Sequence, residues 1–303
     1  MMPPRLKQGD RVMLISSARK VLPEEVNSAV EVLKSWGLIV EFGDNLFAQF
    51  NQFAGNDLQR TNDLQKAIND ESIKAILFAR GGYGTVRIVD AINFYALTKN
   101  PKWIIGFSDI TVLHAHLEKN FGIATLHSPM AFNFQKTPEE VLKKIKSRLF
   151  EGTQQYTVAA HPMNRKGESE GIIIGGNLSI IYSLLGSISD SDTDGKILFL
   201  EDLDEYLYHI DRMLQSLKRA GKLAKLAGLI VGGMSDMKDN LIPFGKSPEE
   251  IILDAVKEFD FPICFGFPSG HLPVNYPLIL GDKIQFSVLE EVSIKSVSAN
   301  GNS

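Results

Sequence analysis

The stretch WIIGFSDITVLHAH, residues 103–116, places a strand, a serine and a helix in direct succession. Residues 103–107 form an uninterrupted apolar run, which is typical of a parallel strand buried on both faces. Residues 109–119 carry apolar positions at roughly helical spacing. Ser108 stands at the junction. A buried strand that passes directly into a helix indicates an α/β fold with a parallel sheet.

The same alternation continues on both sides of this stretch and predicts one α/β domain over residues 1–150, with ligands at the carboxyl ends of its strands. The other predicted strands cover residues 11–16, 38–43, 73–79 and 123–126. The other predicted helices cover residues 23–36 and 57–69, a segment that begins within 84–91, and a lysine-rich segment that ends near residue 150.

The second half has a different pattern. Residues 151–170 are polar, with little periodicity, and we expect them to connect two domains. Residues 171–303 mix short apolar runs with helices, which predicts a smaller, β-rich α+β domain that ends in antiparallel strands. Its predicted strands cover residues 171–175, 196–201, 226–234, 283–288 and 291–297.

The composition argues against several classes of protein. A chain of 303 residues with 44% hydrophobic and 22% charged residues is long enough for a sizeable core. Its net charge of -4 argues against a nucleic-acid partner. Cys264 is the single cysteine, and no Cys/His cluster has the spacing of zinc ligands. We therefore expect no disulfide, no metal and no cofactor.

Two apolar stretches raise the question of a membrane or a leader. The N-terminal run VMLIS is too short for a signal peptide. The uncharged run at 171–189 is interrupted by glycines, an asparagine and serines, so a buried strand, a turn and a core helix explain it better than a membrane span. We expect a soluble cytoplasmic protein.

A glycine-rich turn, FARGGYGTVR at residues 78–87, follows the third predicted strand. It departs from the dinucleotide fingerprint, because Arg87 stands where the last glycine belongs and the turn does not follow the first strand. A tight structural turn and a cradle for an anion or oxyanion both remain open. Arg80 at this strand end is a candidate for binding a substrate carboxylate, with a structural salt bridge as the equal alternative.

Three further positions can carry chemistry. Ser108 is either a helix cap or a nucleophile exposed at a sharp strand-to-helix turn. Glu201 ends the apolar run KILFLE and either belongs to a solvated helix start or is partly buried. A buried carboxylate needs a partner such as a histidine. His271 lies in the loop FGFPSGHLPVNYPLILG and is either a turn histidine without a role or an imidazole held in place by the flanking glycine and proline; His127 is its main rival. Together they supply a nucleophile, a carboxylate and a base in the order Ser–Glu–His.

The ordered motifs ARGGYGTVR, IIGFSDITVLHAHL, IIIGGNLSII, LFLEDLDEYLYHIDRML and GFPSGHLPVNYPLILG resemble the LD-carboxypeptidase family of serine peptidases over essentially the whole chain. The resemblance implies a catalytic triad of Ser108, Glu201 and His271, and an oxyanion hole from the N–H groups of Gly82 and Asp109. It also implies a flavodoxin- or Rossmann-like N-terminal domain, a smaller β-rich C-terminal domain, and often a homodimer.

The implied reaction is release of the terminal D-alanine from a cytoplasmic murein tetrapeptide during cell-wall recycling. The family also contains amidases that resemble the microcin C self-immunity protein and cleave peptidyl or aminoacyl nucleotides. Residues 130–141 leave little room for an aromatic loop that grips a nucleobase, which favours the carboxypeptidase. Two other classes are considered. The broken glycine fingerprint argues against a cofactor-dependent Rossmann enzyme, and a non-catalytic ligand-binding protein gives Glu201 and His271 no reason to meet Ser108.

Overall fold

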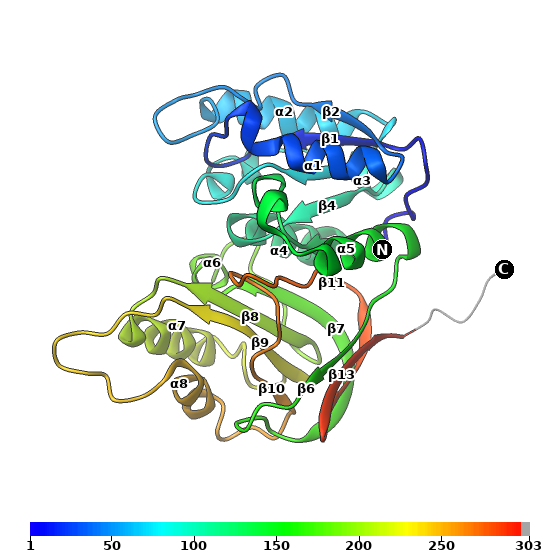
Figure 1. The fold of residues 1–303 in the computed structure, drawn as a ribbon. Coiled ribbons are helices and arrows are strands. Elements are labelled where there is room, and N and C mark those ends of the chain that lie inside the picture. The colour runs from blue at the N-terminus through cyan, green and yellow to red at the C-terminus, as the bar shows by residue number, and fades with distance from the viewer. Residues whose placement is uncertain (298–303) are drawn as a thin grey trace.

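The computed structural model describes residues 1–297 and contains two β-sheets, one above the other in Figure 1. The first sheet has the order β11-β5-β4-β3-β1-β2 and is parallel except for β11. Its strands are β1 (Arg11–Ile15), β2 (Ile39–Phe42), β3 (Ile73–Phe78), β4 (Trp103–Gly106), β5 (Thr125–His127) and β11 (Leu278–Leu280).

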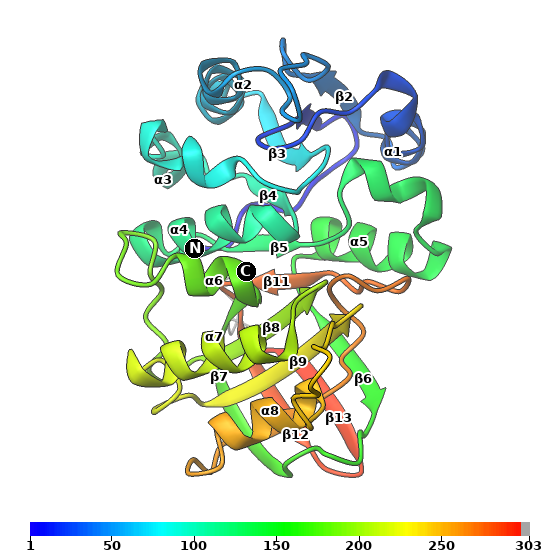
Figure 2. The same cartoon turned by 90° about the vertical axis from the view of Figure 1, so that its left-hand side faces the viewer.

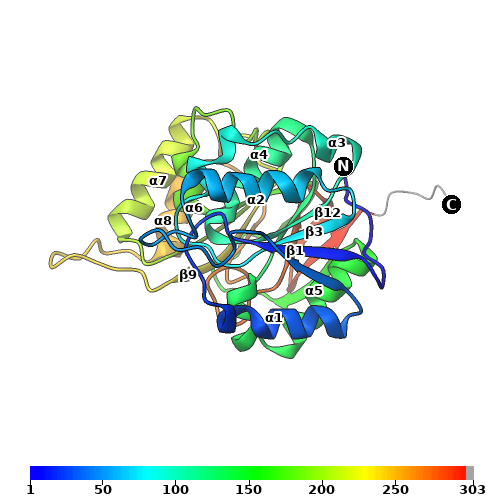
Figure 3. The ribbon, with the colours of Figure 1, turned by 90° about the horizontal axis from the view of Figure 1, so that it is seen from above.

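Helices cover both faces of the first sheet, as its apolar strands require (Figures 2 and 3). One face carries α1 (Pro23–Ser35) and α5 (Glu139–Glu151), and the other carries α2 (Asp57–Asn69), α3 (Ala96–Lys99) and α4 (Thr111–Phe121). Alternate residues of β1 therefore enter two separate cores, with Val12 and Leu14 in one and Met13 and Ile15 in the other. This confirms the predicted α/β class.

The predicted helix that begins within 84–91 is not an α-helix. Residues 85–91 form two 3₁₀ turns, η1 (Thr85–Arg87) and η2 (Val89–Ala91). The segment TVRIVDAI is rich in β-branched residues, which lose side-chain freedom in an α-helix. Burial of Ile88 and Val89 stabilises the irregular path instead.

The second sheet has the order β10-β9-β8-β7-β12-β13-β6. Its parallel half runs from β10 to β7, and β12, β13 and β6 add antiparallel strands beside β7. Its strands are β6 (Gln155–Ala159), β7 (Gly167–Asn177), β8 (Ile197–Leu203), β9 (Gly228–Ser235), β10 (Ile263–Cys264), β12 (Lys283–Val288) and β13 (Glu291–Ser296). Its helices are α6 (Leu178–Ser183), α7 (Leu207–Arg219) and α8 (Pro248–Ala255).

Three strands, β6, β10 and β11, lie where the sequence did not predict them. We expected residues 151–170 to be only a connection, yet they also contain β6, which pairs with β13, and the start of β7. The second half also returns one strand to the first sheet, because β11 pairs with β5 in antiparallel orientation. Tyr156 of β6 is buried, but its polar neighbours conceal the alternation in the sequence.

The long uncharged run at 171–189 divides between β7 and α6. Over residues 1–297, the helices are all too short or too polar to cross a bilayer.

Candidate active site

Ser108 occupies a strained junction between β4 and the 3₁₀ turn η3 (Ser108–Ile110), with φ at 61°. A left-handed conformation is unfavourable for a serine, and such strain is concentrated at functional sites. Ser108 makes no capping hydrogen bond, because Phe107 is the residue at the cap position. Of the two interpretations of Ser108, the helix cap is therefore wrong.

The glycine-rich turn lies against Ser108. A Cβ atom on Gly81 would lie 3.4 Å from Ser108 Oγ, which measures how closely this backbone approaches the serine. Gly82 follows with φ at 110°, a conformation that favours glycine. Among residues 1–297, no acceptor takes the N–H of Gly82. That N–H is therefore available to a ligand beside Ser108.

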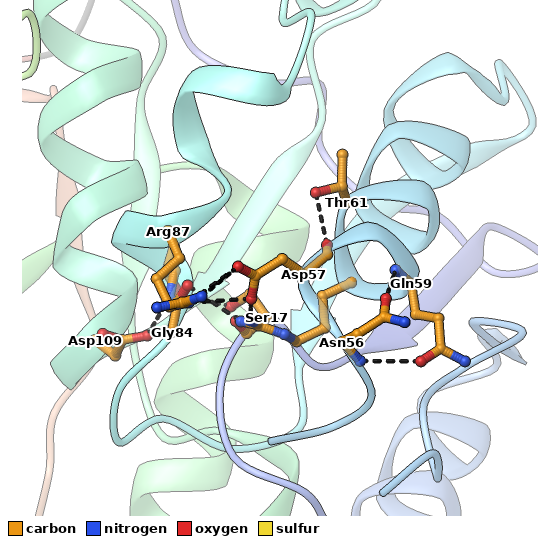
Figure 4. A network of polar contacts seen from close by, with 10 residues as sticks. Ser17, Asn56, Asp57, Gln59, Thr61, Gly84, Arg87 and Asp109 are labelled. Atoms are coloured by element: carbon orange, nitrogen blue, oxygen red, sulfur yellow. Dashed lines mark hydrogen bonds and ion pairs between the residues drawn. The ribbon is translucent and has the colours of Figure 1, made fainter. Parts of the chain in front are cut away.

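A buried polar network fixes this turn, as Figure 4 shows. The N–H of Thr85 donates to Asp109 Oδ2 at 2.9 Å, and the hydroxyls of Thr85 and Ser17 lie 2.7 Å apart. Behind them, the buried Arg60 guanidinium donates to the carbonyl of Gly84 at 3.1 Å. Burial raises the pKa of Asp109, although the Thr85 hydrogen bond opposes that shift. The carboxylate next to Ser108 thus ties the serine turn to the glycine turn.

Glu201 and His271 form a direct buried pair. His271 Nδ1 lies 2.6 Å from Glu201 Oε2, which also accepts from the His271 backbone N–H at 3.2 Å. The Glu201 side chain is fully buried and that of His271 is 16% exposed. Gly270 is necessary here, because a Cβ atom on it would lie 2.6 Å from Glu201 Cβ. Ser235 donates to the His271 carbonyl at 2.6 Å and so holds the loop to β9.

The electrostatics of this pair favour a charged imidazole. Burial by itself lowers the pKa of His271, but the hydrogen bond and charge of Glu201 outweigh it, so the pKa is raised above its ordinary value. A carboxylate bonded to Nδ1 fixes which ring nitrogen faces outward and stabilises the imidazolium. The arrangement is that of a base oriented by a carboxylate.

Asp202, directly after Glu201, points to a different partner. The register of β8 against β9 shifts between Leu200 and Asp202, as in a β-bulge that re-aims side chains. Asp202 Oδ1 accepts from Asn177 Nδ2 and Oδ2 accepts from the N–H of Ser179, both at 2.9 Å. Burial, and then the charge of Glu201, raise the pKa of Asp202 to about 7.

Asn177 also reaches the first sheet. Its backbone N–H donates to Thr111 Oγ1 at 3.0 Å, and Thr111 is the first residue of α4, directly after the Ser108 turn. The preceding Gly176 has φ at 136°, and a Cβ atom there would lie 2.5 Å from Thr111 Oγ1. We call Thr111, Asn177 and Asp202 the clasp; it joins the element that carries Ser108 to the strand that carries Glu201.

Phe107 links the Ser108 turn to His271. Phe107 directly precedes Ser108, and its ring lies 4.7 Å from the imidazole of His271. Both rings line an open hollow of about 410 Å³. In the described part of the chain no hydrogen bond joins the Ser108 hydroxyl to His271; such contacts are often long before substrate binds.

The rival base, His127, is not available for the same role. It is fully buried beneath the site, with its ring 5.0 Å from that of Phe199. Burial lowers its pKa well below the ordinary value. A histidine without solvent access at this position serves packing.

Arg80 contacts two groups of the protein. Its guanidinium lies 3.7 Å from Glu25 Oε1 and 4.2 Å from the ring centre of Phe132. The ion pair agrees with the structural alternative for this residue. The sequence did not single out Thr111, Asn177 or Asp202, although the glycine pair in IIIGGNLSII was a signal of close backbone approach.

Comparisons with known proteins show the family of the chain. Residues 12–128 match the LD-carboxypeptidase N-terminal domain, and residues 170–286 match the LD-carboxypeptidase C-terminal domain. The chain belongs to the LD-carboxypeptidase family. The resemblance inferred from the motifs is confirmed, and membership in this family of serine peptidases supports hydrolase activity.

Relatives within the LD-carboxypeptidase family cover nearly the whole chain. A probable murein peptide carboxypeptidase of Bacillus subtilis is 35% identical over 96% of this chain and 93% of its own. The murein tetrapeptide carboxypeptidase of Pseudomonas aeruginosa is 28% identical over 86% and 88%. The crystal structure of muramoyltetrapeptide carboxypeptidase from Oxalobacter formigenes has a TM-score of 0.86 at 26% identity, over 94% and 98%.

The same fold occurs in the microcin C7 self-immunity protein MccF. One MccF structure has a TM-score of 0.86 at 21% identity and covers 98% of each chain. At that identity the likeness concerns the fold alone. It confirms the expected two-part α/β architecture.

Proposed function

We propose that this protein is a serine LD-carboxypeptidase that releases the terminal D-alanine from murein tetrapeptides in cell-wall recycling. The observation that carries the proposal is the 2.6 Å contact between His271 Nδ1 and the buried Glu201, beside the strained Ser108 turn. Relatives named for murein peptides, at 28% and 35% identity over most of the chain, support the substrate class.

In the proposed mechanism, His271 accepts the proton of Ser108 as the serine oxygen attacks the scissile carbonyl carbon. Glu201 orients the imidazole and stabilises its charged form. The N–H groups of Gly82 and Asp109 donate to the oxyanion that develops on the carbonyl oxygen. His271 then passes its proton to the leaving amine of D-alanine, and water attacks the acyl-enzyme with His271 again as the base.

Three features of the structure support these roles. Gly82 lies in a turn that touches Ser108, and its N–H has no acceptor in the described residues. The N–H of Asp109 lies in the first turn of a helical segment, where backbone donors lack partners within the helix. The hollow of about 410 Å³ beside His271 is large enough for the end of a peptide.

Mass spectrometry of products from a purified murein tetrapeptide tests the proposal. We expect free D-alanine and the tripeptide with the wild-type protein, and neither product with Ser108→Ala. Intact tetrapeptide after prolonged incubation would overturn the proposal. Equal cleavage of the free acid, its C-terminal amide and a pentapeptide would favour the amidase, since such an enzyme does not read the peptide terminus.

We further propose that the enzyme works in the cytoplasm as a homodimer. The proposal follows from the family resemblance, whose members are often dimers. Light scattering after size-exclusion chromatography tests the assembly, and a mass of one chain would contradict it.

A further inference from the structure

The hollow beside His271 has one charged side chain on its wall besides the histidine itself. Four of its lining residues, Phe107, Pro129, Leu272 and Pro273, are apolar. The others are two asparagines, a threonine, a glycine, His271 and Lys136. A hollow that combines apolar walls with a few placed polar and charged groups is the usual form of a site that orients a charged ligand.

The side-chain oxygens of the two asparagines hold the walls. Asn133 Oδ1 accepts from the N–H of Met130 at 3.1 Å, and Asn275 Oδ1 accepts from the N–H of Gly270 at 2.9 Å. Their side chains therefore fix the loops on either side of the hollow. Lys136 differs, because within residues 1–297 no carboxylate lies within ion-pair distance of its ammonium group.

The nearest acidic residues along the chain face other partners. Glu139 pairs with Lys143 at 2.8 Å, and Glu140 Oε1 lies 3.5 Å from the hydroxyl of Tyr276. Lys136 is exposed at the end of the 3₁₀ segment η4 (Ala131–Lys136). An ammonium group without a protein partner, in the same hollow as the base, is free to pair with an incoming anion.

Arg80 supports this segment from behind. Phe132 in η4 donates its N–H to the carbonyl of Ala79 at 2.9 Å, and its ring receives the Arg80 guanidinium at 4.2 Å. Arg80 thereby anchors the segment that presents Lys136, and holds it to the end of β3. Its charge faces Glu25 and does not line the hollow.

We propose that Lys136 is the specificity residue that binds a carboxylate of the peptide substrate in the hollow beside His271. The inference rests on the proposed carboxypeptidase function and goes beyond it by naming the group that reads the substrate's charge. We place the bound carboxylate on one of the two residues that flank the scissile bond, which gives two candidate groups. One is the terminal carboxylate of D-alanine, and the other is the side-chain carboxylate of a diaminopimelate residue, which lysine lacks.

The test compares Lys136→Met with Lys136→Arg on three substrates: the diaminopimelate tetrapeptide, its C-terminal amide, and the lysine-containing tetrapeptide. On the first we expect Lys136→Met to lower kcat/KM about tenfold to a hundredfold, mainly through KM, and Lys136→Arg to restore most of it. The loss should vanish on the substrate that lacks the carboxylate bound by Lys136. Loss of the effect on the amide identifies the terminal carboxylate, and loss of the effect on the lysine peptide identifies the diaminopimelate side chain.

Two further variants act as controls. Lys143→Met removes the same charge at a residue paired with Glu139 and should leave kcat/KM near the wild-type value. Arg80→Met should affect the same substrates as Lys136→Met but less strongly, because it acts by shifting η4, which presents Lys136. A loss for Lys136→Met that is equal on all three substrates, or no larger than that of Lys143→Met, would overturn the inference.

These outcomes separate the two proposals. If the wild-type enzyme cleaves the tetrapeptide and Lys136→Met behaves as Lys143→Met does, the inference fails and the proposed function stands. If the wild-type enzyme releases no D-alanine from any of the three peptides, both fail.

Discussion

The two sheets hold their candidate catalytic groups in different ways. The first sheet holds Ser108 through its backbone, with φ at 61° and a glycine turn packed against it. The second sheet holds Glu201 and His271 through buried side-chain hydrogen bonds. A nucleophile fixed by its backbone can be changed without loss of the fold, whereas a buried carboxylate is bound into its surroundings.

The largest effect should come from Ser108→Ala. This change removes the attacking oxygen and leaves the backbone turn in place, so we expect turnover to fall by about a thousandfold or more. Initial rates on the tetrapeptide measure the loss, and circular dichroism checks the fold. A folded Ser108→Ala variant with substantial activity would exclude Ser108 as the nucleophile.

Glu201→Gln should be less damaging than His271→Ala, because it spoils the orientation and charge of the base without removing it. We expect a loss of about a hundredfold to ten-thousandfold in kcat. Only Glu201→Gln retains His271 as a titrating base. Its rate should therefore change with pH, whereas the rate of His271→Ala should not show that titration. Equal losses in both variants at every pH would contradict the orienting role.

The effect of Glu201 on the pKa of His271 predicts the direction in which stability and activity change with pH. Glu201 raises the pKa of His271, so stability from the pair is fully present below the ordinary pKa of about 6.5 and is lost as pH rises through the folded value. Activity needs the neutral base and rises over the same range. In Glu201→Gln the rising limb of kcat/KM should move to lower pH; an unmoved limb would mean that His271 does not carry it.

A smaller effect is expected where the two regions meet, at the clasp. Thr111→Val keeps the shape of the side chain but removes the acceptor of the buried Asn177 N–H. We expect the free energy of unfolding to fall by about 1–3 kcal/mol. Thr111→Ser retains the hydroxyl and is the matched control. Equal stability of the valine and serine variants in denaturant titrations would argue against the clasp.

The smallest effect concerns the strain at Ser108. Glycine adopts a left-handed conformation without the steric cost that alanine meets, but it loses more entropy on folding. We expect Ser108→Gly to be more stable than Ser108→Ala by about 0.5–1 kcal/mol. Denaturation midpoints of the two inactive variants measure this difference. A more stable alanine variant would mean that the turn stores no strain.

The sequence predicts most of the first sheet, because its strands are short apolar runs separated by helical spacing. It also singles out Glu201 and His271, since a carboxylate at the end of a buried strand needs a partner. It does not reveal the clasp or β11, because Thr111, Asn177 and Leu278 meet partners far away in the chain. The helix prediction after Gly84 is wrong, because burial overrides the weak helical preference of this segment and gives two 3₁₀ turns.

The strand β11 has a consequence for how the chain is made. Until residues 278–280 leave the ribosome, β5 is an open edge of the first sheet, with apolar Leu126 along its unpaired backbone. The first sheet, most of which is translated first, therefore gains its last strand only after nearly the whole second half has been translated. We expect the first half expressed alone to aggregate through that edge, so gene fusion or recombination would have to carry both halves together.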